Sequence, residues 1–195
     1  MNSAPIYLAS RSPRRRELLQ QIAVEFLVIE ADIDESVLPG EVALDYVKRI
    51  AFEKAQAGVK SLSSDDLTFV LAADTAVIVR GEIFGKPVND DDARHMLKLL
   101  SGETHQVMTA IVLANHTQTF IDVSISQVRF GTMTNSDIDW YVSTGEGQDK
   151  AGGYAVQGLG AIFIEEIRGS YSGIMGLPIR ETAQLLKQMD SQCEQ

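Results

Sequence analysis

The sequence predicts an α/β fold in which a long, highly twisted mixed sheet is flanked by helices. Apolar segments of strand length alternate with segments of helical period along the chain. Two β-rich runs, 104–114 and 119–130, exceed the usual strand length and therefore indicate a twisted sheet. Hydrophobic residues occupy 45% of the 195 positions, which is enough to fill the core of one large domain.

The expected elements of the first half are a strand at 6–9, helices at 13–22 and 41–59, a strand at 69–73, and a hairpin with strands 76–79 and 82–84. Ser12 is the expected N-cap of the first helix, and Pro13 suits its first position. Apolar residues at spacings of three and four predict the second helix. Arg80 and Gly81 form the expected hairpin turn.

The expected elements of the second half are a helix at 90–100, the two long strands, a helix at 135–143, a strand at 161–167 and a helix at 179–189. Asn89 is placed to cap the first of these helices. Thr134 and Asp137 form a capping box for the next helix. Polar residues 115–118 turn the chain between the long strands, and a Gly-rich stretch spans 145–160.

Composition excludes several classes of protein. A formal net charge of −10 argues against binding of polymeric nucleic acid, which requires a broad basic face. No apolar stretch approaches the length of a membrane span or an export signal. The one cysteine, Cys193, excludes a disulfide framework and makes the cytoplasm the expected compartment. Without repeats or linkers, we expect one domain over 1–195, whose halves could form two lobes.

A basic cluster follows the first strand. Arg11, Arg14, Arg15 and Arg16 lie beside Ser10, where a strand ends and a helix begins. Guanidinium groups, hydroxyls and the free N–H groups of a helix N-terminus are the parts of a phosphate site. The alternative is that these arginines decorate an exposed helix, although cations in a first helical turn oppose the macrodipole.

Lys54 and Asp74 are charged residues in apolar surroundings. Lys54 lies on the buried stripe of the second helix, either as a functional ammonium or snorkelling to water. Asp74 and Thr75 follow the apolar strand 69–73, so we expect them at its end. A buried carboxylate there implies a metal or lysine partner. The alternative for Asp74 is an Asx turn.

Three loops hold weaker candidates. The acidic residues Asp32, Asp34 and Glu35 could bind a hard cation such as Mg²⁺, or form a solvated loop. Lys86 precedes a proline and could reach a phosphate. Gln157 ends the Gly-rich stretch and could recognise a base edge, unless the stretch is a flexible surface loop. The histidine spacings match no metal motif, and serine hydrolase, P-loop and dinucleotide-binding fingerprints are absent.

Taken in order, five segments resemble the Maf family, also called septum-formation inhibitor proteins. They are LASRSPRR at 8–15, EKA at 53–55, ADT at 73–75, GKP at 85–87 and DKAGGY at 149–154. The segments GSY at 169–171 and GLP at 176–178 extend the match almost end to end. The resemblance implies an elongated α/β fold like that of the inosine triphosphatases, with a nucleotide cleft between two lobes, and a homodimer.

The resemblance also implies roles for individual residues. Asp74 is the expected proton acceptor, and with Glu35 a ligand of the metal. The phosphate-contacting set comprises Ser10, Arg15, Lys54 and Lys86. Arg14, Thr75 and Gln157 match the branch that acts on dTTP and UTP, whereas the branch for 7-methylated GTP carries Trp, Gln and Glu there.

We therefore expect a nucleotide pyrophosphatase that hydrolyses dTTP and UTP to the monophosphate and pyrophosphate. Mg²⁺ or Mn²⁺ is the expected cofactor, with Co²⁺ as a further candidate. Two alternatives stay open: a non-catalytic nucleotide-binding regulator of cell division, and a scavenger of modified pyrimidine nucleotides.

Overall fold

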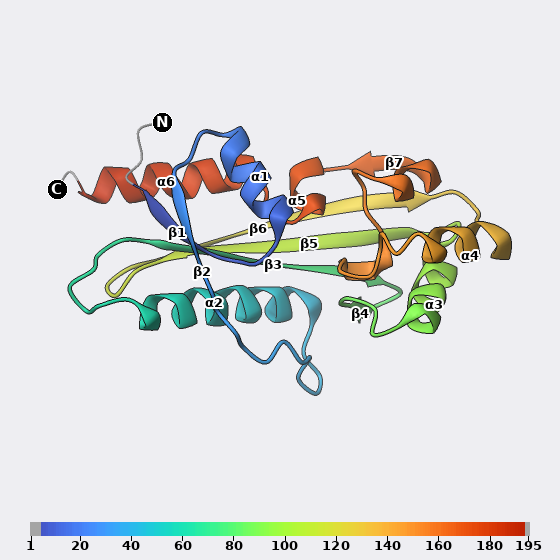
Figure 1. Cartoon of the computed structure of the whole chain (residues 1–195), viewed down its shortest axis with the longest axis horizontal. Helices are drawn as coiled ribbons and strands as arrows, with labels where there is room; N and C mark the ends of the chain where they lie inside the picture. The colour runs from blue at the N-terminus through green and yellow to red at the C-terminus, as the bar shows by residue number, and fades with distance from the viewer. Residues whose placement is uncertain (1–4, 194–195) are drawn as a thin grey trace. The chain divides into compact units, whose positions relative to one another are not determined.

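The computed structural model describes residues 5–193, with side chains through Ser191. Its strands and α-helices are β1 Ile6–Ala9, α1 Pro13–Gln21, β2 Phe26–Ile29, α2 Ala43–Ser61, β3 Val70–Val79, β4 Glu82–Phe84, α3 Asp90–Leu100, β5 Thr104–Ala114, β6 Thr119–Phe130, α4 Asn135–Ser143, β7 Ile164–Arg168, α5 Tyr171–Met175 and α6 Ile179–Cys193 (Figure 1). Short 3₁₀ segments cover Ala151–Gly153 and Leu159–Phe163.

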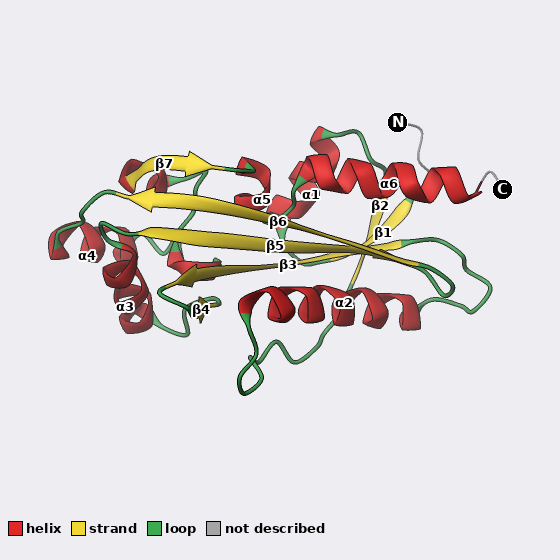
Figure 2. Cartoon of the chain, turned by 180° about the vertical axis from the view of Figure 1, so that it is seen from behind, coloured by secondary structure: helices red, strands yellow, loops and turns green. Residues whose placement is uncertain are grey.

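The strands form a seven-stranded mixed sheet in the order β2-β1-β3-β5-β6-β7, with β4 paired to β3. β1 pairs in parallel with β2 on one side and β3 on the other. The β3–β4 and β6–β7 pairs are antiparallel. Helices accompany the strands throughout (Figure 2), so the predicted mixed α/β class is confirmed.

The chain divides into two compact units. Unit 1 takes in the chain up to Asp74, Thr109–Ser124 and the chain from Gly176 onward. Unit 2 takes in Thr75–Met108 and Ile125–Met175. Because the chain alternates between them, each unit is assembled from segments far apart in the sequence.

In unit 1, helix α2 packs directly on the parallel strands. A Cβ atom at Gly58 would lie 2.8 Å from Val70 Cγ1 and 2.9 Å from Ile29 Cδ1, so only glycine permits this close approach. Lys54 precedes Gly58 by one helical turn and shares its buried face. The packing of α2 therefore brings a lysine side chain to the sheet. Figures 1 and 2 draw α6 on the other side of these strands.

Unit 2 has its own hydrophobic core. It is formed by buried side chains of β3 to β6, α3, α4 and the Gly-rich stretch, among them Val79, Phe84, Leu97, Leu100, Val128, Phe130, Tyr141 and Tyr154. Asn89 caps α3 by accepting a hydrogen bond from the Asp92 amide, and Thr134 and Asp137 form the predicted capping box of α4. Both predicted helix starts are confirmed.

Four local features differ from the sequence prediction. β3 is one continuous strand, so the expectation that Asp74 ends a strand is wrong, and Asp74 lies inside β3. β3 pairs with β1 before the polar pair and with β4 after it. β2 and α5 were not predicted, and β7 begins three residues later than expected because a 3₁₀ turn occupies the start of the run. Ser12 is the N-cap of α1 but makes no side-chain cap bond.

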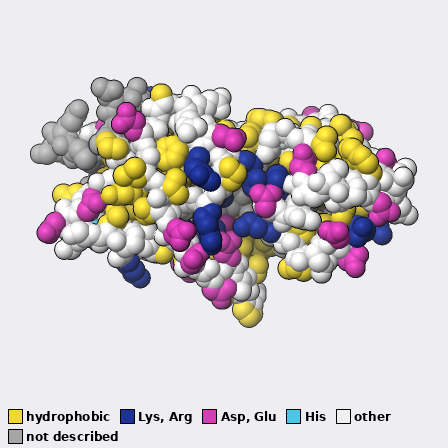
Figure 3. All heavy atoms as spheres, in the orientation of Figure 1, with side chains coloured by type: hydrophobic (Ala, Val, Ile, Leu, Met, Phe, Trp, Pro, Cys, Tyr) yellow, Lys and Arg dark blue, Asp and Glu magenta, His cyan; other side chains and the backbone are white. Residues whose placement is uncertain are grey.

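The surface carries charges of both signs. Figure 3 shows Lys and Arg side chains interspersed with Asp and Glu on the face drawn, rather than a broad basic area. Within residues 5–193, no helix is long and apolar enough to cross a membrane.

Candidate active site

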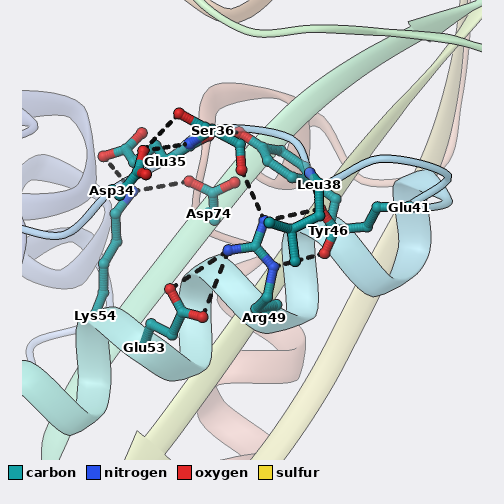
Figure 4. Close-up of polar contacts among 10 residues, drawn as sticks. All are labelled: Asp34, Glu35, Ser36, Leu38, Glu41, Tyr46, Arg49, Glu53, Lys54 and Asp74. Atoms are coloured by element: carbon teal, nitrogen blue, oxygen red, sulfur yellow. Dashed lines mark hydrogen bonds and ion pairs between the residues drawn. The ribbon is translucent and has the colours of Figure 1, made fainter.

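Lys54 binds two carboxylates. It projects from α2, and its Nζ lies 2.8 Å from Asp74 Oδ1 on β3 and 2.9 Å from Glu35 Oε1 on the loop between β2 and α2 (Figure 4). Lys54 and Asp74 are buried, with 8% and 5% of their surface exposed. The ammonium therefore does not snorkel to water, and the partner that the sequence predicts for Asp74 is this lysine.

The two oxygens of Asp74 differ. Oδ1 binds Lys54, whereas Oδ2 is buried and accepts no hydrogen bond from residues 5–193. Burial raises the pKa of Asp74 above its ordinary value, while the positive charges of Lys54 and Arg15 act in the opposite direction. An unsatisfied buried carboxylate oxygen costs roughly 1–3 kcal/mol or more. Asp74 thus presents a strong, preformed acceptor for a proton or a cation.

The β1–α1 turn has the geometry of an anion site. Ser10 Oγ accepts hydrogen bonds from the Ser12 amide at 3.2 Å and from Arg15 Nη1 at 3.3 Å. Arg15 Nε donates to the Gly176 carbonyl at 2.8 Å, which fixes the guanidinium. The first turn of α1 contains no acidic residue that would offset its positive end. The turn therefore combines a helix N-terminus with a hydroxyl and an oriented arginine.

Arg11 and the acidic residues of this region have different partners. Arg11 pairs with Asp32, and both side chains are mostly exposed. Asp34 accepts hydrogen bonds from the amide and hydroxyl of Ser36. Glu35 alone of the three acidic candidates contacts Lys54 in the described structure. The predicted acidic cation site is thus reduced to Glu35, because its two neighbours bind other groups.

Three predicted site residues belong to unit 2. Thr75 is half-buried on β3, Lys86 is exposed between β4 and α3, and Gln157 is exposed in a turn of the Gly-rich stretch. The Lys86 turn is joined to that stretch, since the Gly152 amide donates to the Gly85 carbonyl at 3.0 Å. Within unit 2, the segments that carry Lys86 and Gln157 are therefore neighbours.

The Gly-rich stretch is held by Glu146, which the sequence analysis did not single out. Its carboxylate accepts hydrogen bonds from the Leu159 amide at 2.9 Å, the Gly160 amide at 3.1 Å and the Tyr141 hydroxyl at 2.8 Å. Tyr141 in turn accepts from the Ala155 amide. The backbone on both sides of Gln157 is therefore fixed, contrary to a flexible loop.

Two further residues were missed on α2. The Tyr46 hydroxyl donates to the Glu35 carbonyl at 3.0 Å, and Arg49 Nη2 donates to the Ser36 carbonyl at 2.9 Å. Their spacing of three places them side by side on the helix. The spacing of Tyr46 and Arg49 is visible in the sequence, but it does not indicate which loop the two side chains bind.

The residues around Lys54 fit a divalent metal that arrives with a nucleotide. In the described part of the chain, no three His, Cys, Asp or Glu side chains are grouped to hold a metal ion alone. Mg²⁺ is commonly bound by one or two carboxylates together with water and substrate phosphates. Asp74 and Glu35 supply two carboxylates against one ammonium, and Asp74 Oδ2 is an acceptor without a partner.

A family model and curated relatives match nearly the whole chain. A family model described as "Maf-like protein" matches residues 5–189. The dTTP/UTP pyrophosphatase of Aromatoleum aromaticum is 52% identical, over 94% of this chain and 95% of that protein. The protein of the same name from Methylobacillus flagellatus is 52% identical, over 96% of this chain and 94% of its own length. Among solved structures, the Staphylococcus aureus Ham1 protein is 18% identical with a TM-score of 0.47, over 65% of this chain and 72% of that one.

Proposed function

This chain belongs to the family of Maf-like proteins, and we propose that it is a pyrophosphatase that hydrolyses dTTP and UTP to the monophosphate and pyrophosphate. The observation that carries the proposal is the buried, unpartnered Oδ2 of Asp74 beside Lys54. A site that only binds a triphosphate has no need of such a carboxylate, because it would repel the ligand. A hydrolase needs it to accept a proton.

In the proposed reaction, a water molecule attacks the α-phosphorus while the bond to the pyrophosphate oxygen breaks. Asp74, whose Oδ2 is buried beside Lys54, accepts the proton of the attacking water. Lys54 holds Asp74 and Glu35 in place. Ser10 and Arg15 bind the phosphates and stabilise the charge that develops on the departing pyrophosphate. For Lys86, the same role is implied by the family resemblance.

Mg²⁺ or Mn²⁺, or alternatively Co²⁺, is the proposed cofactor, held by Asp74 and Glu35. When bound, a divalent ion acidifies water and neutralises phosphate charge. Removal of divalent metal with a chelator is expected to abolish turnover, and addition of Mg²⁺ is expected to restore it. Undiminished hydrolysis in the chelator would refute this part of the proposal.

Pyrimidine specificity is assigned to Arg14, Thr75 and Gln157, which match the dTTP and UTP branch of the family. The relatives named dTTP/UTP pyrophosphatase, at about half identity over most of the chain, support the pyrimidine substrate. The assignment to these three residues follows from the family resemblance. We further propose that the protein is a cytoplasmic homodimer. Light scattering coupled to gel filtration measures the mass of the assembly and so tests the homodimer.

The deciding experiment is a panel of nucleoside triphosphates with Mg²⁺ and with Mn²⁺, in which the released products are identified. Monophosphate with pyrophosphate is the expected result for dTTP and UTP. Diphosphate with orthophosphate would reject the reaction, and a preference for purines would reject the specificity. Modified pyrimidine triphosphates in the same panel test the scavenging alternative.

A regulator without activity is tested by Asp74→Asn. The proposed reaction predicts a loss of about 10²- to 10⁴-fold in kcat with dTTP still bound, since general-base groups contribute that much. The regulator predicts nucleotide binding without turnover in either protein.

A further inference from the structure

Glu35 lies on a loop with little apolar packing. Residues 30–42 join β2 to α2 without helix or strand, and most are exposed. Three hydrophobic side chains on this loop, Val37, Leu38 and Val42, are 47%, 51% and 59% exposed, and Ile33 is half-buried. The Glu35 side chain is itself 44% exposed, although it contacts the buried Lys54. Polar contacts are therefore needed to set its position.

Two side chains of α2 bind the backbone at Glu35. The Tyr46 hydroxyl donates to the Glu35 carbonyl, and Arg49 Nη2 donates to the carbonyl of the next residue, Ser36. Figure 4 shows both side chains reaching the loop from the helix that also carries Lys54. The backbone and the carboxylate of Glu35 are thus bound by one rigid element.

Glu41 orients Arg49. Its two carboxylate oxygens accept from Arg49 Nε at 2.6 Å and Nη2 at 2.8 Å, and Oε2 also accepts from the Leu38 amide at 3.0 Å. Arg49 therefore binds the Ser36 carbonyl and the Glu41 carboxylate of the loop, and Glu41 in turn binds the Leu38 amide. The Arg49 guanidinium lowers the pKa of Glu41 to about 2, so the pair stays ionised throughout the working pH range.

We propose that Arg49, assisted by Glu41 and Tyr46, is a positioning residue that holds the Glu35 carboxylate at Lys54 and Asp74 for the reaction. The inference deepens the proposed function, and its catalytic part rests on that function. The part of the inference in which Arg49 holds the loop is independent of the proposed function. A bidentate guanidinium suits this task because it fixes direction as well as distance, which a lysine ammonium cannot.

The first test measures dTTP hydrolysis. Arg49→Ala is expected to lower kcat/KM by about 10- to 100-fold, as for residues that orient metal-binding carboxylates. Arg49→Lys is expected to recover only part of the loss. Arg94→Ala is the matched control, because Arg94 is also half-buried and binds two carboxylates, Asp91 and Asp139, but lies on α3 of unit 2. It is expected to change kcat/KM less than twofold. Wild-type kcat/KM in Arg49→Ala would overturn the inference.

The second test separates positioning from general stabilisation. In a Glu35→Gln background, Arg49→Ala is expected to add less than a twofold loss, because the group that Arg49 positions has already been changed. An equal loss in both backgrounds would overturn the inference. Tyr46→Phe removes one hydroxyl from the same loop and is expected to give a smaller loss that also disappears in the Glu35→Gln background.

Hydrogen exchange tests the holding of the loop without any reaction. In Arg49→Ala, a peptide covering 31–42 is expected to exchange faster than in the wild type, while one covering 50–61 keeps its rate. Unchanged exchange at 31–42 would overturn the inference. If the wild type hydrolyses neither dTTP nor UTP, the proposed function fails by itself, and hydrogen exchange still decides whether Arg49 holds the loop.

Discussion

Replacing Lys54 by methionine tests the arrangement at the centre of the site. Methionine keeps a long unbranched side chain but removes the ammonium. Asp74 Oδ1, now 2.8 Å from Nζ, would lose its cation, and Oδ2 already has no hydrogen-bond partner. The variant would therefore leave an uncompensated carboxylate inside unit 1.

The expected loss of unfolding free energy follows from the burial of this pair. Removing one partner of a buried ion pair costs about 3–5 kcal/mol. Glu35 adds little, because pairs with exposed carboxylates contribute about 0–1 kcal/mol. Protonation of Asp74 would relieve the loss, since burial already raises its pKa. We expect a loss of about 3 kcal/mol at high pH that decreases as the pH falls.

Urea unfolding at pH 8 and pH 5 measures this loss. Lys60→Met is the matched control, because Lys60 lies on the same helix and is exposed. Lys54→Met/Asp74→Asn should recover part of the stability by removing the orphaned charge. A loss at pH 8 below about 1 kcal/mol would show that the pair is not buried as described. Equal stability of the single and double variants would refute the electrostatic reasoning.

Three other predictions concern unit 2. Burial lowers the pKa of His105 from 6.5 to about 4, so the folded protein resists protonation of this side chain. The stability of the fold is therefore complete above pH 6.5, and about 3 kcal/mol of it should be lost as the pH falls to 4. Urea unfolding should show a flatter pH dependence in His105→Gln. Gly152→Ala should lower stability by about 1–3 kcal/mol in the same assay, since φ is +71° and the new Cβ would lie 2.8 Å from Val77 Cγ2; wild-type stability would contradict this. Glu146→Gln replaces one hydrogen-bond acceptor of the Gly-rich stretch by a donor, so the backbone around Gln157 loses part of its support. The ratio of kcat/KM for UTP to that for GTP should therefore fall. An unchanged ratio would exclude a role of Glu146 in substrate specificity.

Much of the fold could be predicted because its signals are local. The caps at Asn89 and Thr134 fix where α3 and α4 begin, and long runs rich in strand-forming residues define β5 and β6. The prediction that a strand ends at Asp74 was wrong because strand pairing is not a local signal. Local propensity places a polar pair outside a strand, but pairing with neighbouring strands carries β3 through it.

The candidate site was predictable only where chemistry demands a partner. A carboxylate after an apolar strand requires a cation, and this requirement anticipated the pairing of Asp74 with a lysine. Arg49 and Tyr46 gave no such signal, because they bind backbone carbonyls. Every residue has a carbonyl, so nothing in the sequence of the loop distinguishes the ones that are bound.

The hydrogen bond from Arg15 to the Gly176 carbonyl also bears on synthesis of the protein. The two residues are 161 positions apart, so a ribosome that has just made Arg15 must add most of the chain before this acceptor exists. At about 5–20 residues per second, the interval is on the order of ten seconds or longer. During translation, the β1–α1 turn is made early, but its arginine is among the last parts of unit 1 to be completed.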